Sequence, residues 1–360
     1  MKVKLKELGT ISTGNTPNKN ISEFYDAEDI GFVKPDIISD LRIDYIVKTT
    51  EYLSEAARTK ARIVKRDAVF VTCIGSIGKV GITKGDEFAF NQQINAIEPN
   101  EKILPKYLAY SIWANKKKLQ AIANAPVVPI INKTQFGEFE IDITDDVDEQ
   151  VRIVKLLDKV CAIITDRKTE LEKLDELIKA RFVELFGDPI RNTQNRPTTD
   201  FINVVKMQRG FDLPVQDRQQ DGDIPVFGSN GALDRHNVAK VQGGGVITGR
   251  SGTIGKVYYT EGDYWPLNTS LFSVDTHGNN IIYLAYLLQM YDLSRFTEGT
   301  GVPTLNRNKF HNKPIIDVPL SEQDAFASFV KQTDKSKVAV QKALDEAQIL
   351  FDSLMQKYFG

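Results

Sequence analysis

Apolar residues recur at alternating steps of four and three along two stretches of the chain, from about Asp148 to Gly187 and again over residues 320–360. This spacing is the 3.5-residue period of a coiled-coil seam, and charged residues fill the positions between. At about 1.5 Å per residue, some 40 helical residues extend roughly 60 Å, which is longer than a compact domain needs. The pattern therefore predicts two long helices whose narrow apolar stripes pair antiparallel with each other.

The two seams are related by one constant shift in numbering, so that Leu157 corresponds to Val330 and Gly187 to Gly360. Polar residues also lie on the seams, where we expect them mainly to fix the register of the helices, with subunit docking as the alternative. These polar positions are Arg167, Arg181, Thr333 and Lys337. The apolar seam consists of Ile153, Leu157, Val160, Ile164, Leu171, Leu174, Ile178, Leu185, Phe326, Val330, Val340, Leu344, Phe351 and Leu354.

Short motifs outside the helices repeat at nearly the same shift as the seams. The repeated motifs are Gly75-Ser76-Ile77-Gly78-Lys79-Val80 with Gly252-Thr253-Ile254-Gly255-Lys256-Val257, Tyr107-Leu108-Ala109-Tyr110 with Tyr283-Leu284-Ala285-Tyr286, and Pro129 and Asn132 with Pro303 and Asn306. Chance is a poor explanation for so many matches in one order, so the sequence predicts a duplicated unit. The expected parts are a first globular unit at residues 1–144, a central helix at 145–187, a second globular unit at 188–319 and a final helix at 320–360.

The globular parts are predicted to have an α+β fold. The glycine-rich turn that contains Ser76 lies between two expected strands, and Pro105 stands where a helix would begin. Expected strands are Gly31–Val33, Ala68–Cys73, Phe88–Ile97, Phe139–Ile143 and Asp223–Phe227. Lys106–Ala123 is expected to be helical, residues 125–136 to be extended, and the polar segment Ile190–Thr199 to be a linker.

Two similar globular units joined by paired helices would form a molecule with two related heads and a pseudo-twofold axis. Such a molecule suits a ligand with two spaced sites, and double-stranded DNA is the commonest ligand of this kind. The alternative is a duplicated coiled-coil scaffold whose heads bind protein partners. The residues alone leave both interpretations open.

Composition narrows the picture only a little. The chain has 360 residues, of which 41% are hydrophobic and 26% charged, and it has no apolar run of the length that a membrane span requires. We therefore expect a cytoplasmic protein without a membrane partner. The net charge of -2 counts mildly against nucleic-acid binding, which would have to come from local patches. Cys73 and Cys161 are expected to be buried thiols and form no paired motif.

The sequence contains no pattern of catalytic or metal-binding residues. Residues 244–251 differ by one residue from a phosphate-binding loop, with Arg250 where the motif requires lysine, and a strand rather than a helix is expected to follow. The three histidines, His236, His277 and His311, have no metal-ligand spacing and are expected to be solvated loop residues. We therefore expect neither a catalytic residue nor a metal site in this chain.

The order of these motifs resembles that of the specificity subunits of type I restriction-modification enzymes. The resemblance covers nearly the whole chain and rests on the motifs together, since each motif alone is weak. They are Lys-Leu-x-x-Leu-Gly from Lys4, Thr-Gly-Asn-Thr-Pro from Thr13, the two Gly-x-Ile-Gly-Lys-Val turns with Asn91-Gln92-Gln93 and Asn268 downstream, the helix entries Glu149-Gln150 and Glu322-Gln323, and the helix exit Leu185-Phe186-Gly187-Asp188-Pro189.

The resemblance implies that each globular unit is a target-recognition domain for one part of a split site in double-stranded DNA. It also implies that the helices set the spacing between the half-sites and dock two methyltransferase subunits. Those subunits would use S-adenosylmethionine, and endonuclease or translocase subunits would use ATP with Mg. This chain itself would carry no cofactor. The two units differ outside the shared motifs, as at Lys34-Pro35-Asp36 against Phe227-Gly228-Ser229, so the recognised bases cannot be predicted.

On this interpretation, basic and amide side chains in or beside turns are the candidates for DNA contact. Lys79 and Lys256 occur in both units and are better candidates for phosphate than for base contact; the alternative is that the repeated turns are purely structural hairpins. Base contacts are expected from positions that differ between the units. The full candidate set is Lys34, Ser76, Lys79, Asn91, Gln92, Gln93, Asn132, Lys133, Asn230, Arg235, Arg250, Ser251, Lys256, Asn268, Thr269, Asn306 and Arg307.

Overall fold

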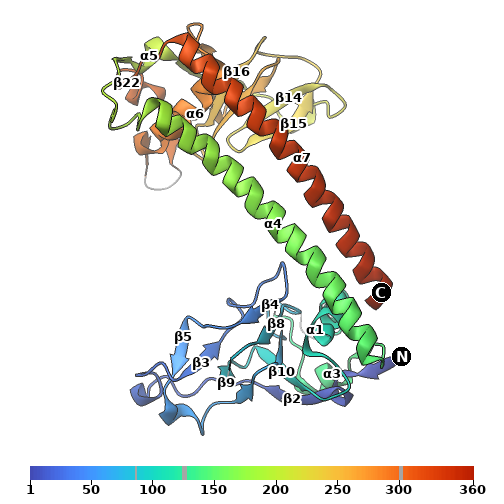
Figure 1. Ribbon diagram of the computed structural model, residues 1–360. Helices are drawn as coiled ribbons and strands as arrows, with labels where there is room; N and C mark the ends of the chain where they lie inside the picture. The colour runs from blue at the N-terminus through green and yellow to red at the C-terminus, as the bar shows by residue number, and fades with distance from the viewer. Residues whose placement is uncertain (86, 124–127, 300–302) are drawn as a thin grey trace. The chain divides into compact units, whose positions relative to one another are not determined.

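The computed structural model describes residues 1–85, 87–123, 128–299 and 303–360 (Figure 1). The chain divides into two compact units, of which the first comprises Met1–Asp166 with Ala343–Gly360 and the second Arg167–Lys342. Two 40-residue helices, α4 (Val147–Phe186) and α7 (Leu320–Phe359), contribute to both units. The first unit therefore contains the start of α4 and the end of α7, and the second contains the end of α4 and the start of α7.

The first unit is built on a five-stranded sheet with the strand order β2-β10-β7-β8-β4 and a four-stranded sheet with the order β5-β3-β9-β6. A short pair, β1 with β11, ties its first residues to the segment that precedes α4. The strands are β1 Lys2–Lys4, β2 Gly9–Thr13, β3 Ile30–Val33, β4 Asp44–Ile46, β5 Glu51–Leu53, β6 Ile63–Lys65, β7 Val69–Thr72, β8 Val80–Thr83, β9 Glu87–Phe90, β10 Ile94–Pro99 and β11 Glu140–Asp142, and the helices are η1 Leu5–Glu7, η2 Ser22–Phe24, η3 Glu55–Ala57, α1 Pro105–Ala114, α2 Lys116–Ala121 and α3 Lys133–Glu138.

The second unit repeats this plan with a four-stranded sheet, β13-β19-β16-β17, and a three-stranded sheet, β15-β14-β18. In both units the smaller sheet contains a parallel pair, β3 with β9 and β14 with β18. The strands are β12 Thr198–Asp200, β13 Lys206–Arg209, β14 Ile224–Gly228, β15 Gly231–His236, β16 Gly245–Gly249, β17 Val257–Thr260, β18 Trp265–Pro266, β19 Ser270–Asp275, β20 Thr297–Glu298, β21 Thr304–Leu305 and β22 Pro314–Ile316, and the helices are α5 Phe201–Val204, η4 Val215–Asp217, α6 Ile281–Tyr291, η5 Leu293–Phe296 and η6 Arg307–Lys309. The predicted internal repeat and the mixture of helices and strands are confirmed.

Several predicted elements were wrong in detail, and asparagines explain most of the differences. The expected strand Phe88–Ile97 is two strands, because Asn91 accepts a hydrogen bond from the Gln93 N–H (3.1 Å) and forms a turn between them. The expected helix Lys106–Ala123 is interrupted at Asn115 between α1 and α2. Asn132 caps α3, so residues 133–136 are helical rather than extended. Residues 125–127 of that expected extended segment lie outside the described residues, and the expected linker already enters β12 at Thr198.

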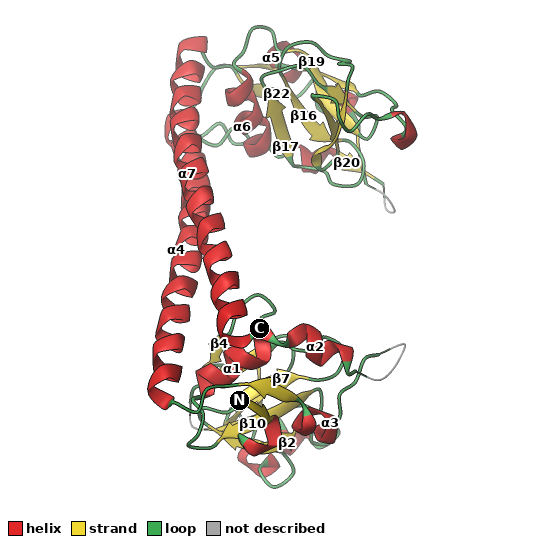
Figure 2. Ribbon diagram, turned by 90° about the vertical axis from the view of Figure 1, so that its right-hand side faces the viewer, coloured by secondary structure: helices red, strands yellow, loops and turns green. Residues whose placement is uncertain are grey.

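Aromatic rings at the ends of the long helices complete the core of each unit. In the first unit Phe359 of α7 packs on Tyr107 of α1, with ring centroids 5.1 Å apart, and in the second unit Phe186 of α4 packs on Tyr283 of α6 at 5.2 Å. The end of α7 lies beside α1 in Figure 2. Buried positions in these last turns recur every four residues, at Ile178, Phe182 and Phe186 and at Phe351, Met355 and Phe359.

The predicted seam therefore changes phase near the end of each helix. Leu185 and Leu354 are only partly buried there, whereas the neighbouring residues Phe186 and Met355 are buried. Each step of four advances about 40° beyond a full turn of a 3.6-residue helix, so over these last two turns the buried stripe rotates away from the seam and faces the globular body. Of the other seam residues, Ile153, Leu157, Val160, Ile178, Phe326, Val330, Val340 and Phe351 are buried, and Ile164, Leu171, Leu174 and Leu344 are partly buried.

A buried glutamine near the start of each long helix joins that helix to its globular unit. Gln150 is 0% exposed, accepts a hydrogen bond from the Leu104 N–H (2.9 Å) and donates to the Thr144 carbonyl (2.9 Å). Gln323 makes the corresponding bonds to the Asn280 N–H (2.9 Å) and the Val318 carbonyl (2.8 Å). Each glutamine satisfies backbone groups that burial would otherwise leave unpaired, which fixes the helix entry in the same way in both units.

Candidate nucleic-acid interface

The two Gly-x-Ile-Gly-Lys-Val segments form the same turn. Gly75 and Gly78 have φ angles of 73° and 85°, and Gly252 and Gly255 have φ angles of 82° and 91°. Glycine adopts these left-handed angles without steric cost, which explains why both turns carry glycine at these positions. The turn in the first unit connects β7 with β8, as the sequence predicted, and places Ser76 in an exposed position.

Backbone hydrogen bonds bring two other loops of the first unit against this turn. The Cys73 N–H donates to the Gln93 carbonyl (2.7 Å), and the Cys73 carbonyl accepts from the Ile131 N–H (2.9 Å). A β-bridge between Ile74 and Ile130 extends the contact. The turn, the segment Asn91–Gln93 and the segment that leads to Asn132 therefore lie together.

The second unit contains the equivalent bonds at equivalent positions. The Arg250 N–H donates to the Thr269 carbonyl (2.8 Å), and the Arg250 carbonyl accepts from the Leu305 N–H (2.8 Å). The bridge between Ser251 and Thr304 takes the place of the bridge between Ile74 and Ile130. The structure thus brings most of the candidate contact residues of each unit into one group of loops.

A further loop joins each group, and its counterpart in the second unit was not recognised from the Thr-Gly-Asn-Thr-Pro motif that begins it in the first. The Gly14 N–H donates to the Ile94 carbonyl (3.1 Å), and the Gly210 N–H donates to the Ser270 carbonyl (3.1 Å). A Cβ atom at Gly14 or Gly210 would collide with backbone carbonyl oxygens of the facing strand. Because Gly14 and Gly210 lie farther apart in the chain than the members of the other repeated motifs, the common shift does not relate them. The sequence signal that could have revealed the match is a proline shortly after each glycine, Pro17 after Gly14 and Pro214 after Gly210, although the spacing differs by one residue.

The basic candidates differ in how free their charges are. Lys34 forms an ion pair with Glu51. The Lys79 Nζ atom instead donates to the Pro35 carbonyl (3.3 Å), and within the described part of the chain Lys79 forms no ion pair with a carboxylate. Lys256 is exposed and contacts Asn230, its Nζ atom lying 3.3 Å from the Asn230 Oδ1 atom. Lys133 and Arg235 are also exposed.

Several amide candidates have structural partners inside the protein. Asn91 is 5% exposed and its side chain bonds to Gln93, so neither of these two amides is free. Asn132 and Asn306 cap α3 and η6, and the Asn268 side chain bonds to Asp212. The remaining amide and hydroxyl candidates lie at or near the surface: Ser76, Gln92 and Asn230 are exposed, while Ser251 and Thr269 are partly buried. The Gln92 Oε1 atom accepts a hydrogen bond from the Thr16 hydroxyl (2.8 Å), which leaves the amide NH2 group of Gln92 as its donor toward a ligand. Arg250 is partly buried and its Nη1 atom lies 3.5 Å from the Asn268 carbonyl.

The prediction that all three histidines are solvated was wrong for two of them. His236 and His311 are each 8% exposed, and His311 accepts a hydrogen bond from the Met207 N–H at its Nε2 atom (3.2 Å). The strand β13 has a register shift between Lys206 and Met207, and there the imidazole of His311 supplies the acceptor for the Met207 N–H. Burial lowers the pKa of His311, and the charges of Arg307 and Lys206 lower it further.

The cysteine prediction holds for one of the two thiols. Cys73 is buried, which raises its pKa to about 12, whereas Cys161 is only partly buried on α4 beside Tyr110.

Among the described residues, no group of three or more His, Cys, Asp or Glu side chains is placed to hold a metal ion. No helix in the described ranges is both long and apolar enough to cross a membrane. The near match to a phosphate-binding loop is strand β16 followed by a turn.

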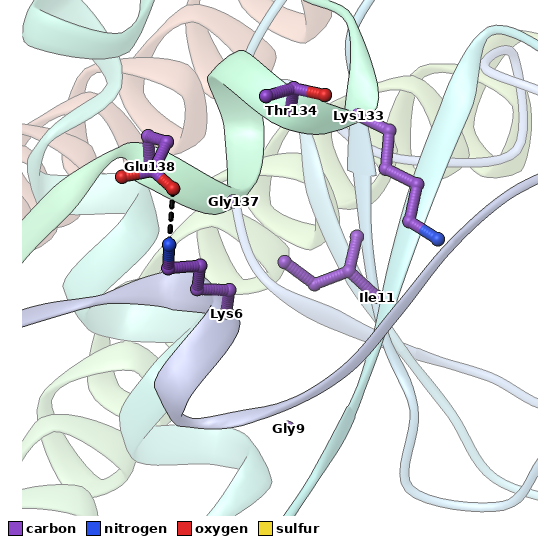
Figure 3. A pocket seen from close by; sticks show the side chains of 7 residues that line it. All are labelled: Lys6, Gly9, Ile11, Lys133, Thr134, Gly137 and Glu138. Atoms are coloured by element: carbon purple, nitrogen blue, oxygen red, sulfur yellow. Dashed lines mark hydrogen bonds and ion pairs between the residues drawn. The ribbon is translucent and has the colours of Figure 1, made fainter.

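A shallow pocket in the first unit marks a difference from the second (Figure 3). It is lined by Lys6, Gly9, Ile11, Lys133, Thr134, Gly137 and Glu138. Glu138 pairs with Lys6 and with Lys4 (2.7 Å), which lowers the pKa of Glu138 to about 2. Lys133 extends away from this cluster. The shift that relates Asn132 to Asn306 also relates Gly137 to His311, so the pocket lies where the second unit carries an imidazole.

A duplicated α/β unit with loops gathered on a common frame and a buried glutamine at each helix entry defines the class of this chain. Residues 1–174 and 191–348 each match the model of the type I restriction modification DNA specificity domain, and the chain belongs to that family. The resemblance found in the sequence is confirmed.

Individual relatives agree with this assignment. The specificity subunit of the type I restriction enzyme MjaIX of Methanocaldococcus jannaschii is 25% identical over 197 residues, which cover 53% of this chain and 45% of that protein. The EcoR124I/EcoR124II specificity subunit of Escherichia coli is 28% identical over 164 residues, which cover 43% of this chain and 39% of that protein. The aligned segments thus span less than half the length of these curated relatives.

Solved structures show the same fold. The S subunit of a type I restriction-modification system from M. genitalium superimposes with a TM-score of 0.65 at 15% identity, covering 100% of this chain and 96% of that chain. A chain of a type I R-M system studied for its complex assembly and conformational transition gives a TM-score of 0.63 at 15% identity, covering 99% of this chain and 97% of that chain.

Proposed function

We propose that this chain is the non-catalytic specificity subunit of a type I restriction-modification complex and that each unit contacts one half of a bipartite site in double-stranded DNA. The observation that carries the proposal is the repeated frame of backbone bonds, from Cys73 to Gln93 and from Arg250 to Thr269, beneath loops whose side chains differ. A constant frame with variable side chains meets the need to read two different half-sites with one architecture.

Side chains shared by the two units are assigned to phosphates, and side chains that differ are assigned to bases. Lys79 and Lys256 occupy equivalent turns, as do Lys133 and Arg307 beside their capping asparagines. A contact that is identical in both units cannot distinguish two half-sites, whereas phosphates are the same everywhere. The proposed base contacts come from Lys34, Ser76 and Gln92 in the first unit and from Asn230, Arg235, Arg250, Ser251 and Thr269 in the second.

The helices α4 and α7 are proposed to pair antiparallel along their length and to set the distance between the half-sites. Two observations support this proposal. In each unit the start of one helix packs with the end of the other, and in the second unit Lys337 of α7 forms an ion pair with Asp175 of α4 (2.6 Å). Lys337 is one of the polar seam residues, so this pair can fix the register of the two helices.

Methyltransferase subunits are proposed to dock on exposed apolar residues of the same helices. Leu177 on α4 and Leu350 on α7 are 48% and 49% exposed, and the shift that relates the two seams places them at equivalent positions of the repeat. Equivalent apolar sites suit two copies of one partner. The methyl donor S-adenosylmethionine, and the ATP and Mg of endonuclease or translocase subunits, are assigned to the partners.

The double variant Leu177→Glu with Leu350→Glu should abolish co-purification of the methyltransferase while each unit keeps its melting temperature. Retained co-purification would exclude this docking site.

Methylome sequencing tests the proposed function directly. Cells that carry this chain with its methyltransferase partner should acquire a methylated split motif that is absent when the chain is deleted. Insertion of four residues into both long helices adds roughly 6 Å, nearly two base pairs, so the gap within the motif should widen. If no motif depends on the chain, DNA recognition is refuted in favour of a protein-binding scaffold. A motif with an unchanged gap would refute only the spacing role.

A further inference from the structure

A hollow in the second unit is lined by two arginines, Arg209 and Arg307, and the proposed function gives a role to Arg307 alone. It is lined by Gln208, Arg209, Gly210, Phe211, Asp212 and Arg307. Arg209 is exposed at the end of β13, and Arg307 begins the short helix η6. Neither guanidinium is paired with a carboxylate among the described residues, and Asp212, the acidic residue of the lining, bonds to the Asn268 side chain. The hollow therefore offers unsatisfied donors for a ligand rich in acceptors.

The backbone around the hollow is held rigidly. The Phe211 N–H donates to the Pro266 carbonyl (2.8 Å), the Phe211 carbonyl accepts from the Asn268 N–H (2.9 Å), and a side chain at Gly210 would collide with the facing strand. On the other side of β13, His311 holds the Met207 N–H. Arg209 therefore extends from a fixed backbone, which is the condition for a directional contact rather than a loose electrostatic one.

The first unit has no counterpart of Arg209. Thr13 pairs with Asn95 in β2 and β10 as Arg209 pairs with Leu271 in β13 and β19, which identifies Thr13 as the equivalent residue. The Thr13 hydroxyl donates to the Asn95 Oδ1 atom (2.6 Å), so it has a partner inside the protein. Arg307, in contrast, is matched by Lys133. A positive charge at the position of Arg307 therefore occurs in both units, whereas the positive charge of Arg209 occurs only in the second unit.

From this contrast we infer that Arg209 reads a guanine in the half-site of the second unit, while Arg307 binds an adjacent backbone phosphate. The guanidinium of Arg209 would donate to the O6 and N7 atoms of the guanine in the major groove, the commonest specific contact of arginine with DNA. A phosphate contact suits the shared residue Arg307, because both half-sites have phosphates. The inference rests on the proposed function and names one residue and one base within it.

The test uses the complex of this chain with its methyltransferase subunits and the motif found by methylome sequencing. Arg209→Ala should lower affinity for the specific duplex by about 10- to 100-fold, change non-specific affinity by less than about threefold, and make one guanine position of one half-site degenerate. Replacement of that guanine by 7-deazaguanine should weaken binding of the wild type and leave the variant unaffected. Arg209→Lys, which keeps the charge without the paired donors, should lose specificity as Arg209→Ala does.

Arg307→Ala should weaken binding to all duplexes equally and reduce the salt slope by about one, and Arg307→Lys should preserve binding. Arg66→Ala, a change of an exposed arginine in the first unit, serves as the control and should leave the motif intact. If Arg209→Ala weakens specific and non-specific binding equally, Arg209 contacts phosphate and the base assignment is overturned. An unchanged motif and affinity in a variant with the wild-type melting temperature would exclude the hollow from the interface. Absence of any motif in the wild type would refute the proposed function itself.

Discussion

The two units differ where their smaller sheets turn, and they agree where they meet the long helices. In the second unit β14 passes into β15 through Ser229 and Asn230, whereas in the first unit the chain runs from β3 through residues 34–50, including β4, before it reaches β5. At the helices, the contacts of Phe186 and Gln323 reproduce those of Phe359 and Gln150. The duplication has kept the attachment of each unit constant while its far loops have changed. This division lets the far loops vary without disturbing the attachment to the long helices.

The largest expected effect comes from removing the aromatic ring at either helix end. Phe186→Ala should cost the second unit about 3–5 kcal/mol, because Phe186 contacts Phe182, Tyr283 and Phe326. Phe359→Ala should cost the first unit about 3 kcal/mol, near the low end of that range, because Tyr107 is its one aromatic ring partner among the described residues.

Hydrogen exchange resolved by segment measures both losses. Each variant should lose protection in the unit that receives the ring, and Val183→Ala, which shortens an exposed side chain of α4, should change stability by less than about 0.5 kcal/mol. If Phe359→Ala loosened the second unit as much as the first, the comparison between the two attachments would be wrong.

A smaller effect separates the units by pH. The pKa of His311 is lowered from 6.5 in the folded state, so the unfolded chain takes up a proton first and the second unit loses stability as the pH falls below about 6.5. Protonation also removes the acceptor for the Met207 N–H, a bond worth about 1 kcal/mol.

The first unit has Gly137 at the position that corresponds to His311. Its neighbour Glu138 has a pKa lowered from 4.5 to about 2, so its contribution is present above pH 4.5 and is lost only as the pH falls through about 2.

Urea unfolding followed by hydrogen exchange at pH 7.5 and 5.5 should therefore show weakening of the second unit alone. The variant His311→Gln should remove most of this pH dependence. Equal weakening of both units would show that the imidazole does not cause the difference.

The smallest expected effect concerns two equivalent tyrosines. The Tyr107 hydroxyl accepts a hydrogen bond from the Thr144 N–H (3.2 Å), whereas the buried Tyr283 hydroxyl has no partner among the described residues. Tyr107→Phe should cost about 1 kcal/mol, and Tyr283→Phe should be neutral within about 0.5 kcal/mol or slightly stabilising. Chemical denaturation of the two variants gives the comparison. A larger cost at Tyr283 than at Tyr107 would reverse the expected order.

Local rules recovered much of the architecture from the sequence. The helical period located both long helices, and the glycines of the two turns were predictable because positive φ angles favour that residue. The phase change at Phe182, Phe186, Met355 and Phe359 was not foreseen, since it depends on a globular surface rather than on the helix itself. The turn role of Asn91 was not foreseen either, because a turn asparagine and a base-reading asparagine have the same sequence signature.

The candidate interface was predictable only where its residues repeat. Equivalence between Thr13 and Arg209 emerges from strand pairing, β2 with β10 and β13 with β19, which no local pattern encodes. The hollow around Arg209 likewise requires residues from distant parts of the chain to meet. Exposed side chains that differ between the units follow neither a repeat nor a period, so they are the last to be found from sequence.

The last turns of α7 belong to the first unit, and this affects the order in which the two units can complete their folding during synthesis. Residues 343–360 complete the first unit, yet they leave the ribosome after the whole of the second unit has been made. Until these residues are made, Tyr107 and its apolar neighbours on α1 stay exposed to solvent. The first unit is therefore synthesised first but completes its folding last, and its exposed apolar surface is the part that a chaperone would need to bind.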